Sequence, residues 1–120
     1  MTGQTIAATA DGWARARSHM RALGPRWADD IAAGRRLVLE TYTPLLAQAS
    51  TDAYTVVRDL AYGPHARHRL DVYRPASRLR EPAPVVIFVH GGGFVRGDMN
   101  ANAQIYGNVP RYFARHGCVA

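Results

Sequence analysis

The fold is decided by the stretch Val-Val-Ile-Phe-Val-His-Gly-Gly-Gly-Phe-Val-Arg-Gly-Asp, residues 85–98. Its first part, Val85–Val89, is apolar throughout and mostly β-branched, without the alternation that marks a half-buried strand. Such a run is typical of a strand that is covered on both faces in a parallel sheet. The sequence therefore predicts a buried strand over residues 85–89.

Three consecutive glycines, Gly91–Gly93, follow His90 at the end of this predicted strand. Each glycine inside a strand or helix costs about 0.5–1 kcal/mol relative to alanine. A chain tolerates such a run where the backbone adopts conformations that a Cβ forbids, or where another group approaches it closely. Each glycine also leaves its N–H uncovered. A turn of uncovered N–H groups at the end of a buried strand is suited to stabilising negative charge.

Length and composition exclude several classes of protein. The chain has 120 residues and a formal net charge of +6, and all fifteen basic residues are arginine. The arginines are scattered and no recognition motif accompanies them, which disfavours nucleic-acid binding. The single cysteine, Cys118, suits a reducing compartment. Residues 1–10 lack the regions of a signal peptide, and no apolar run reaches the roughly 18–20 residues of a membrane span. We therefore expect a cytoplasmic protein.

Two helices are predicted in the first 50 residues. Apolar residues of the first helix recur at spacings of three, four and three: Trp13, Ala16, Met20 and Leu23. Asp11 is expected to cap this helix, and Gly24–Pro25 to end it. A second helix is expected to begin after Asp29 or Asp30 and to be closed by Pro44 and the stretch Gln48–Asp52. Residues 1–10 are small and polar, and we expect them to be disordered.

The rest of the chain predicts a hairpin and a further helix. Tyr54–Tyr62 is rich in β-forming residues, His68–Arg74 alternates, and a turn separates them, which indicates an antiparallel hairpin. After the glycines, Asn108 is expected to cap a helix that ends before Gly117. Cys118–Ala120 is predicted to begin a fourth strand.

This order of elements resembles the opening half of an α/β-hydrolase of the hormone-sensitive-lipase and short-chain carboxylesterase type. It is similar to bacterial esterases of the feruloyl esterase and arylformamidase-like group. The likeness covers residues 54–120: Leu70–Pro75 resembles part of the hairpin, and His90–Phe94 with Gly97–Asp98 resembles the oxyanion loop. The fold class implied is α/β, an antiparallel hairpin plus the start of a parallel sheet, preceded by short helices. Residues 1–50 would be an N-terminal helical segment and a possible cap element, and 51–120 part of the hydrolase domain.

The resemblance also implies a chemistry, the hydrolysis of a small acyl ester by a Ser-Asp/Glu-His triad without cofactor or metal. Gly92 and Gly93 would donate backbone N–H groups to the oxyanion. Each such donor is worth about 2.7–4 kcal/mol of transition-state stabilisation. His90, Gly91 and Asp98 would support the loop. In the family topology the fourth strand lies between the hairpin and the third strand.

The chain departs from the family because it lacks the nucleophile elbow Gly-x-Ser-x-Gly. Its serines are Ser18, Ser50 and Ser77, and none has flanking glycines. In the family the nucleophile, the acid and the histidine all follow the oxyanion loop. We therefore expect the triad beyond Ala120, and we expect this chain, cut at the start of its fourth strand, to be inactive alone.

The same residue types are also found in other kinds of site. His90 as a general base and Cys118 as a nucleophile are both disfavoured, and no ligand spacing supports a metal site. Phosphate binding at the glycines would need the motif G-x-x-x-x-G-K-[ST], and the chain has no lysine. Asp98 could be a simple turn former. The apolar stripe of residues 13–23 could line a substrate cap or pack in an ordinary way. Two other functions stay open: amide or formamide hydrolysis by an arylformamidase-like enzyme, and a non-catalytic binding module on the same fold.

Overall fold

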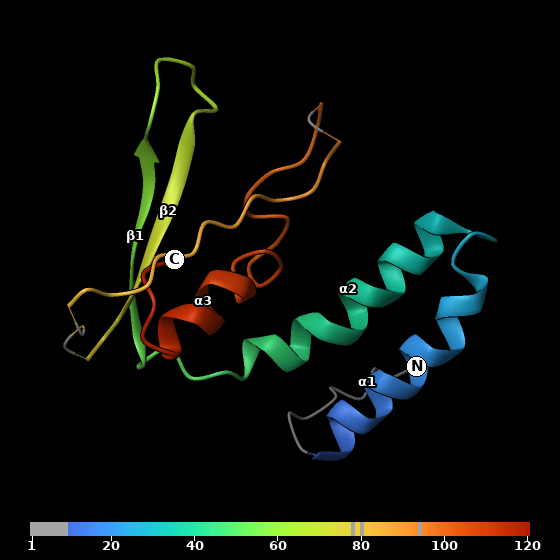
Figure 1. Ribbon diagram of the computed structural model, residues 1–120. Helices are drawn as coiled ribbons and strands as arrows, with labels where there is room; N and C mark the ends of the chain where they lie inside the picture. The colour runs from blue at the N-terminus through green and yellow to red at the C-terminus, as the bar shows by residue number, and fades with distance from the viewer. Residues whose placement is uncertain (1–9, 78, 80, 94) are drawn as a thin grey trace. The chain divides into compact units, whose positions relative to one another are not determined.

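The computed structural model describes residues 10–77, 79, 81–93 and 95–120 (Figure 1). The chain divides into two compact units, one ending at Ala49 and the other covering Ser50–Ala120. The first unit is helical, and the second holds a β-hairpin, the glycine segment and one helix. None of the helices in the described residues has the length and apolar character needed to cross a bilayer.

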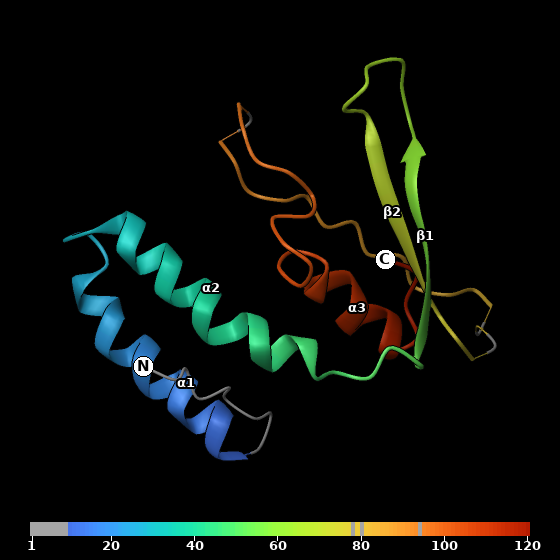
Figure 2. The same cartoon turned by 180° about the vertical axis from the view of Figure 1, so that it is seen from behind.

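The helical unit is a pair of adjacent helices, α1 (Ala10–Leu23) and α2 (Ile31–Ala47), joined through the short 3₁₀ helix η1 (Gly24–Arg26) (Figure 2). Ala16 of α1 is fully buried, and Leu45 of α2 is 1% exposed. Of the predicted stripe, Ala16 is buried, whereas Trp13 is 37% exposed and its ring lies 6.2 Å from that of Tyr42 in α2. Gly24 ends α1, as expected, because the glycine and the proline after it do not continue an α-helix.

The caps of this unit differ in part from the prediction. Asp30 caps α2: its Oδ1 accepts a hydrogen bond from the Ala33 N–H at 2.9 Å. Asp11 is not a cap, because α1 begins at Ala10 and places Asp11 in its first turn, where a carboxylate still favours the helix dipole. Pro44 lies inside α2, which ends at Ala47, directly before the stretch Gln48–Asp52 that was expected to close it. The Gln48 side-chain amide donates a hydrogen bond to the Pro44 carbonyl at 3.1 Å, which satisfies one carbonyl of the last turn. Of the residues expected to be disordered, 1–9 lie outside the described residues.

The second unit contains the predicted antiparallel hairpin, β1 (Tyr54–Ala61) and β2 (Arg69–Pro75). Both strands match the expected ranges to within one residue at each end. The ladder is interrupted between Val57 and Leu60, where the register shifts by one residue. The alternation of apolar residues on β2 is therefore sufficient to predict the hairpin, but not its irregularity.

A buried carboxylate accommodates this bulge. Arg58 and Asp59 together face the single residue Asp71, and Asp59 has a left-handed φ of 59°. The Asp71 carboxylate accepts hydrogen bonds from the Asp59 N–H at 2.9 Å and from the Arg58 guanidinium at 2.9 Å. Its side chain is only 8% exposed. Asp71 thus satisfies the backbone N–H that the bulge removes from the ladder.

The core of this unit is centred on Tyr73, which is 2% exposed. Its ring lies 5.9 Å from that of Tyr54. A Cβ at Gly107 would lie 3.3 Å from the Tyr73 hydroxyl oxygen, so the backbone passes close to it. The helix α3 (Asn108–Arg115) begins directly after this glycine and buries Ala114. The N-cap is therefore Gly107, one residue earlier than predicted.

The end of the chain lies where the expected topology puts the fourth strand. Val119 forms a parallel bridge with Val85, and its carbonyl accepts from the Val86 N–H at 2.8 Å. Ala120 exchanges two hydrogen bonds with Tyr73, at 2.7 and 2.9 Å. Residues 119–120 therefore lie between β2 and residues 84–86, beside the hairpin (Figure 1). The expected strand order, with the fourth element between the hairpin and the third, is confirmed for these residues.

The predicted strand over residues 85–89, covered on both faces, is wrong in this structure. Val85 takes part in one bridge, and residues 86–90 have no regular secondary structure. Ile87 is 86% exposed and Val89 is 74% exposed. The apolar pattern is present, but a strand needs neighbours. Of the described residues, only 119–120 pair with this segment, and they reach no further than Val86.

Candidate functional site: the glycine segment

A tight turn follows His90 and is built on the glycines. The Gly92 carbonyl accepts hydrogen bonds from the Arg96 N–H at 3.2 Å and from the Val95 N–H at 3.4 Å. Gly92 has φ +154° and Gly93 has φ +64°. A Cβ at Gly92 would lie 1.6 Å from the Arg96 carbonyl oxygen, so no other residue fits there without opening the turn. At Gly93, by contrast, a Cβ would meet open space.

The turn uses its carbonyls and leaves the N–H groups of its three glycines uncommitted among the described residues. Between residues 90 and 98, as far as the structure describes them, the carbonyls that accept hydrogen bonds include those of Gly92 and Gly97. Within the same described residues, the N–H groups of Gly91, Gly92 and Gly93 donate to no other group. Gly93 is exposed and Gly92 is partly exposed. The segment therefore presents free backbone donors, which is the property that the sequence predicted for it.

His90 and a second glycine pack on the start of this turn. The His90 Nδ1 lies 2.8 Å from the Gly91 carbonyl oxygen, to which it donates in the tautomer that carries the proton on Nδ1. Gly97 has φ +99°, and a Cβ there would lie 2.5 Å from the same oxygen and 3.3 Å from the His90 Nδ1. The structure thus brings three of the motif residues, His90, Gly91 and Gly97, into direct contact.

Tyr106 supports this arrangement and was not singled out from the sequence. Its ring lies 5.9 Å from the His90 ring and 6.1 Å from the Phe88 ring. Its φ of 70° is left-handed, which directs the chain into Gly107 and α3. A Cβ at Gly91 would lie 3.3 Å from the Tyr106 hydroxyl oxygen. No local pattern in the sequence marks this tyrosine, because its partners lie 15 or more residues away.

Asp98 orders the chain that follows the glycine segment. Its Oδ1 accepts a hydrogen bond from the Asn100 N–H at 2.9 Å. Asn102 makes the same kind of turn: its Oδ1 accepts from the N–H groups of Gln104 at 2.8 Å and Ile105 at 2.7 Å. These are Asx turns, which hold a loop in shape without regular structure. The bond made by Asp98 is that of a turn former, and its role as an anchor of the oxyanion loop stays a prediction.

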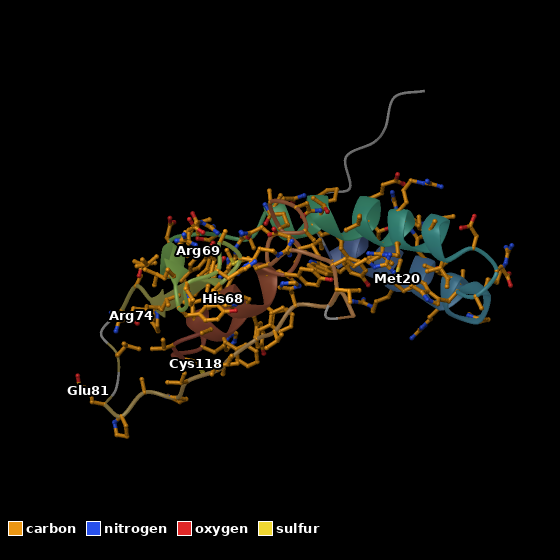
Figure 3. All side chains as sticks on the ribbon, turned by 90° about the horizontal axis from the view of Figure 1, so that it is seen from above. Met20, His68, Arg69, Arg74, Glu81 and Cys118 are labelled. Carbon is orange, nitrogen blue, oxygen red and sulfur yellow. The ribbon has the colours of Figure 1, made fainter. Side chains whose placement is uncertain are left out.

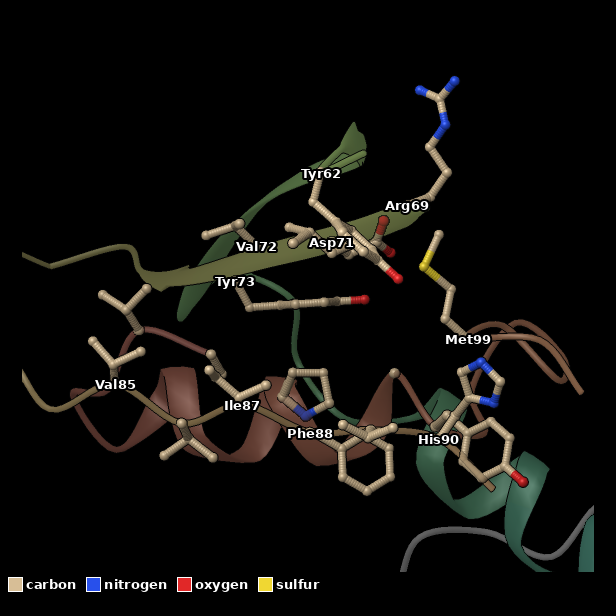
Figure 4. Close-up of a pocket in the computed structure, with 18 of the residues that line it drawn as sticks. Tyr62, Arg69, Asp71, Val72, Tyr73, Val85, Ile87, Phe88, His90 and Met99 are labelled. Carbon is tan, nitrogen blue, oxygen red and sulfur yellow. The ribbon is translucent and has the colours of Figure 1, made fainter. Parts of the chain in front are cut away.

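A cavity of about 510 Å³ lies between β2 and residues 85–90 (Figure 4). Val72 and Tyr73 lie on one side, and Val85, Ile87 and Phe88 lie on the other, with His90 at one end. Val119 and Ala120 also line it. Val119 is hydrogen-bonded to residues 84 and 86, and Ala120 is hydrogen-bonded to Tyr73 of β2. The cavity therefore lies where a longer fourth strand would continue. At residues 119–120 a single extended segment fills the gap between the two sides, and two strand spacings amount to about 9.5 Å.

The described residues contain neither a nucleophile elbow nor a metal site. Ser18 lies in α1, Ser50 precedes β1 and Ser77 follows β2, so the three serines lie outside the glycine segment. No group of three or more His, Cys, Asp or Glu side chains in the described part of the chain could hold a metal ion. Cys118 has a free thiol. Its backbone N–H donates a hydrogen bond to the Phe113 carbonyl at 3.1 Å, at the end of α3.

Comparison with known proteins shows a likeness to a solved esterase structure. No family model and no curated protein matches the chain. The crystal structure of esterase B from Lactobacillus rhamnosis (HN001) is similar, with a TM-score of 0.50 and 26% sequence identity. The alignment covers 88% of this chain and 31% of that esterase, so the chain spans under a third of the length of its neighbour. The likeness agrees with a partial α/β fold.

Proposed function

We propose that this chain is the N-terminal part of a serine-type carboxylic-ester hydrolase, and that residues 90–98 are its oxyanion loop. The observation that carries the proposal is the turn at Gly92, which uses its carbonyl for closure and keeps the N–H groups of Gly92 and Gly93 free. The similarity to an esterase structure supports the same assignment. The sequence motif His-Gly-Gly-Gly adds a third, independent line of support.

In the proposed reaction a serine attacks the ester carbonyl, and negative charge develops on the carbonyl oxygen. The N–H groups of Gly92 and Gly93 donate hydrogen bonds to that oxyanion, together with the N–H of the residue after the nucleophile. Such donors stabilise the transition state because they are already oriented before the charge appears. Losing one of them typically costs about 10²–10³-fold in kcat.

The supporting residues fix the loop rather than react. His90 is proposed to support the loop, since its Nδ1 lies against the Gly91 carbonyl and its ring against that of Tyr106. Gly97 packs on Gly91 from the other side. The nucleophile, the acid and the base of the triad would come from chain that follows residue 120.

The test is to express the complete reading frame that encodes this chain and to compare its product with residues 1–120 alone. We expect a Gly-x-Ser-x-Gly motif after Ala120, and hydrolysis of p-nitrophenyl acetate or butyrate that a serine-directed phosphonate abolishes. Residues 1–120 alone should release nitrophenol no faster than an unrelated protein at the same concentration. Absence of both the motif and phosphonate-sensitive turnover would favour a binding module. Turnover of an aryl formamide that exceeds turnover of esters would favour the amide hydrolase.

A further inference from the structure

The turn of the β-hairpin is held in shape by its own histidines. The His65 N–H donates to the His68 Nδ1 at 3.2 Å, and the Arg67 N–H donates to the His65 Nδ1 at 3.1 Å. The His68 ring also stacks on the Tyr62 ring, with centroids 5.2 Å apart. A Cβ at Gly63 would lie 2.5 Å from the His68 Nδ1, so the backbone approaches that ring closely. The turn is therefore a defined structure that can hold a side chain in place.

One side chain of this turn reaches the glycine segment. The Arg67 Nη2 donates a hydrogen bond to the Gly97 carbonyl at 2.5 Å, across 30 residues of sequence. Arg69, two residues later, donates instead to the carbonyls of Ala66 at 3.4 Å and Asp59 at 3.2 Å. Its contacts stay within the hairpin, where it lies beside His68 (Figure 3). The two arginines carry the same charge, but their hydrogen bonds differ.

Gly97, whose carbonyl accepts the hydrogen bond from Arg67, also packs against the residues that begin the turn. The space that a Cβ of Gly97 would occupy lies 2.5 Å from the Gly91 carbonyl oxygen and 3.3 Å from the His90 Nδ1. Only a residue without a Cβ fits there, so the Gly97 backbone packs closely on those groups. A guanidinium on its carbonyl restrains it from moving away, because charge-assisted hydrogen bonds are short and directional.

We propose that Arg67 is a positioning residue, which holds the glycine segment in the conformation that keeps its N–H groups free. This inference rests on the proposed function where it concerns catalysis, and on the hydrogen bond to Gly97 where it concerns structure. Arg67 does not touch the reacting atoms. It acts through Gly97 on Gly91 and Gly92, and so links the hairpin to the oxyanion loop.

The experiment uses the product of the complete reading frame, labelled with ¹⁵N-glycine, in three variants: Arg67→Ala, Arg67→Lys and Arg69→Ala. Residues 1–120 contribute 11 glycine amides, four of them in the glycine segment at positions 91–93 and 97. We expect Arg67→Ala to shift the amides of residues 91–93 and 97 and to leave those of Gly24 and Gly34 unchanged. Arg69→Ala should leave the glycine segment unchanged, and Arg67→Lys should restore most of the wild-type shifts.

Ester hydrolysis by the same variants gives the second measurement. We expect Arg67→Ala to lower kcat by about ten- to a hundredfold, with little change in KM, because a misplaced loop stabilises the transition state poorly. Equal shifts in Arg67→Ala and Arg69→Ala, or loss of all glycine signals together, would overturn the proposal by showing a general effect on the fold. Unchanged shifts with unchanged kcat would also overturn it while leaving the esterase intact. Specific shifts in a protein that hydrolyses no ester would uphold the positioning role and refute the proposed function.

Discussion

The apolar segment that lies beside the fourth-strand position should make residues 1–120 unstable in isolation. Val85, Ile87 and Val89 are 70, 86 and 74% exposed. Burying one such side chain contributes about 1.5–3 kcal/mol. Leaving three of these side chains exposed therefore loses about 5–9 kcal/mol of stabilisation by burial. This loss is comparable to the whole free energy of unfolding of many small domains, about 5–15 kcal/mol. An uncharged β-branched edge is also a template for aggregation.

The perturbation is to append a five-residue strand, Val-Thr-Val-Thr-Val, directly after Ala120. The register of the existing bonds places its first residue opposite Val72 and Ile87, and its third opposite Leu70 and Val89. We expect residues 1–120 alone to elute as aggregate or to unfold without cooperativity. The extended chain should give a monomeric peak and one cooperative urea transition.

Two controls decide whether the added strand acts through this cavity. A Gly-Ser extension of equal length should leave the chain as unstable as before. An Ile87→Asp substitution in the extended chain should remove the gain, because it places a charge beside the added strand. If residues 1–120 alone are monomeric and unfold in one cooperative transition, the reasoning from the exposed segment is wrong.

Two further substitutions test the site and the hairpin. In the product of the complete reading frame, Gly92→Ala should lower kcat for ester hydrolysis by about 10²–10³-fold, since its Cβ would meet the Arg96 carbonyl oxygen and open the turn. Gly93→Asn should retain most of the activity, because its Cβ meets open space and asparagine tolerates a φ of +64°; equal losses in both variants would contradict this assignment. Asp71→Asn should lower the free energy of unfolding by about 1.5–3 kcal/mol in urea titrations, because a charged acceptor of two hydrogen bonds is lost. The exposed Asp59→Asn is its control and should be nearly neutral.

The sequence predicted those parts of the fold that depend on local pattern. The alternation around Leu70 and Val72 places the hairpin, and Gly24–Pro25 and Asp30 mark the helix ends. The sequence also predicted an unusual turn at the three glycines, because glycine readily adopts the positive φ angles that Gly92 and Gly93 have. In each case the responsible groups lie within a few residues of one another.

The parts that the sequence did not predict depend on distant partners. The apolar, β-branched pattern of residues 85–89 indicates only that they tend to form a strand. Whether they do so is decided by the segments that lie beside them. The bond from Arg67 to Gly97 and the ring contact between Tyr106 and His90 join residues 30 and 16 positions apart. The bulge opposite Asp71 was missed because an arginine and an aspartate in a strand resemble ordinary solvent-facing positions.

The free donors of the glycine turn also bear on the choice between an oxyanion loop and a phosphate loop. A phosphate loop places its N–H groups at the first turn of a helix, so that the helix dipole adds to them. Here the nearest following helix, α3, begins at Asn108, ten residues after Asp98, and Gly92–Arg96 forms a turn closed on its own carbonyl. The glycine turn therefore lacks the helix dipole that such a phosphate loop adds to its N–H groups, and the chain has no lysine to contact the phosphates. These two differences separate the turn from a phosphate loop that opens a helix.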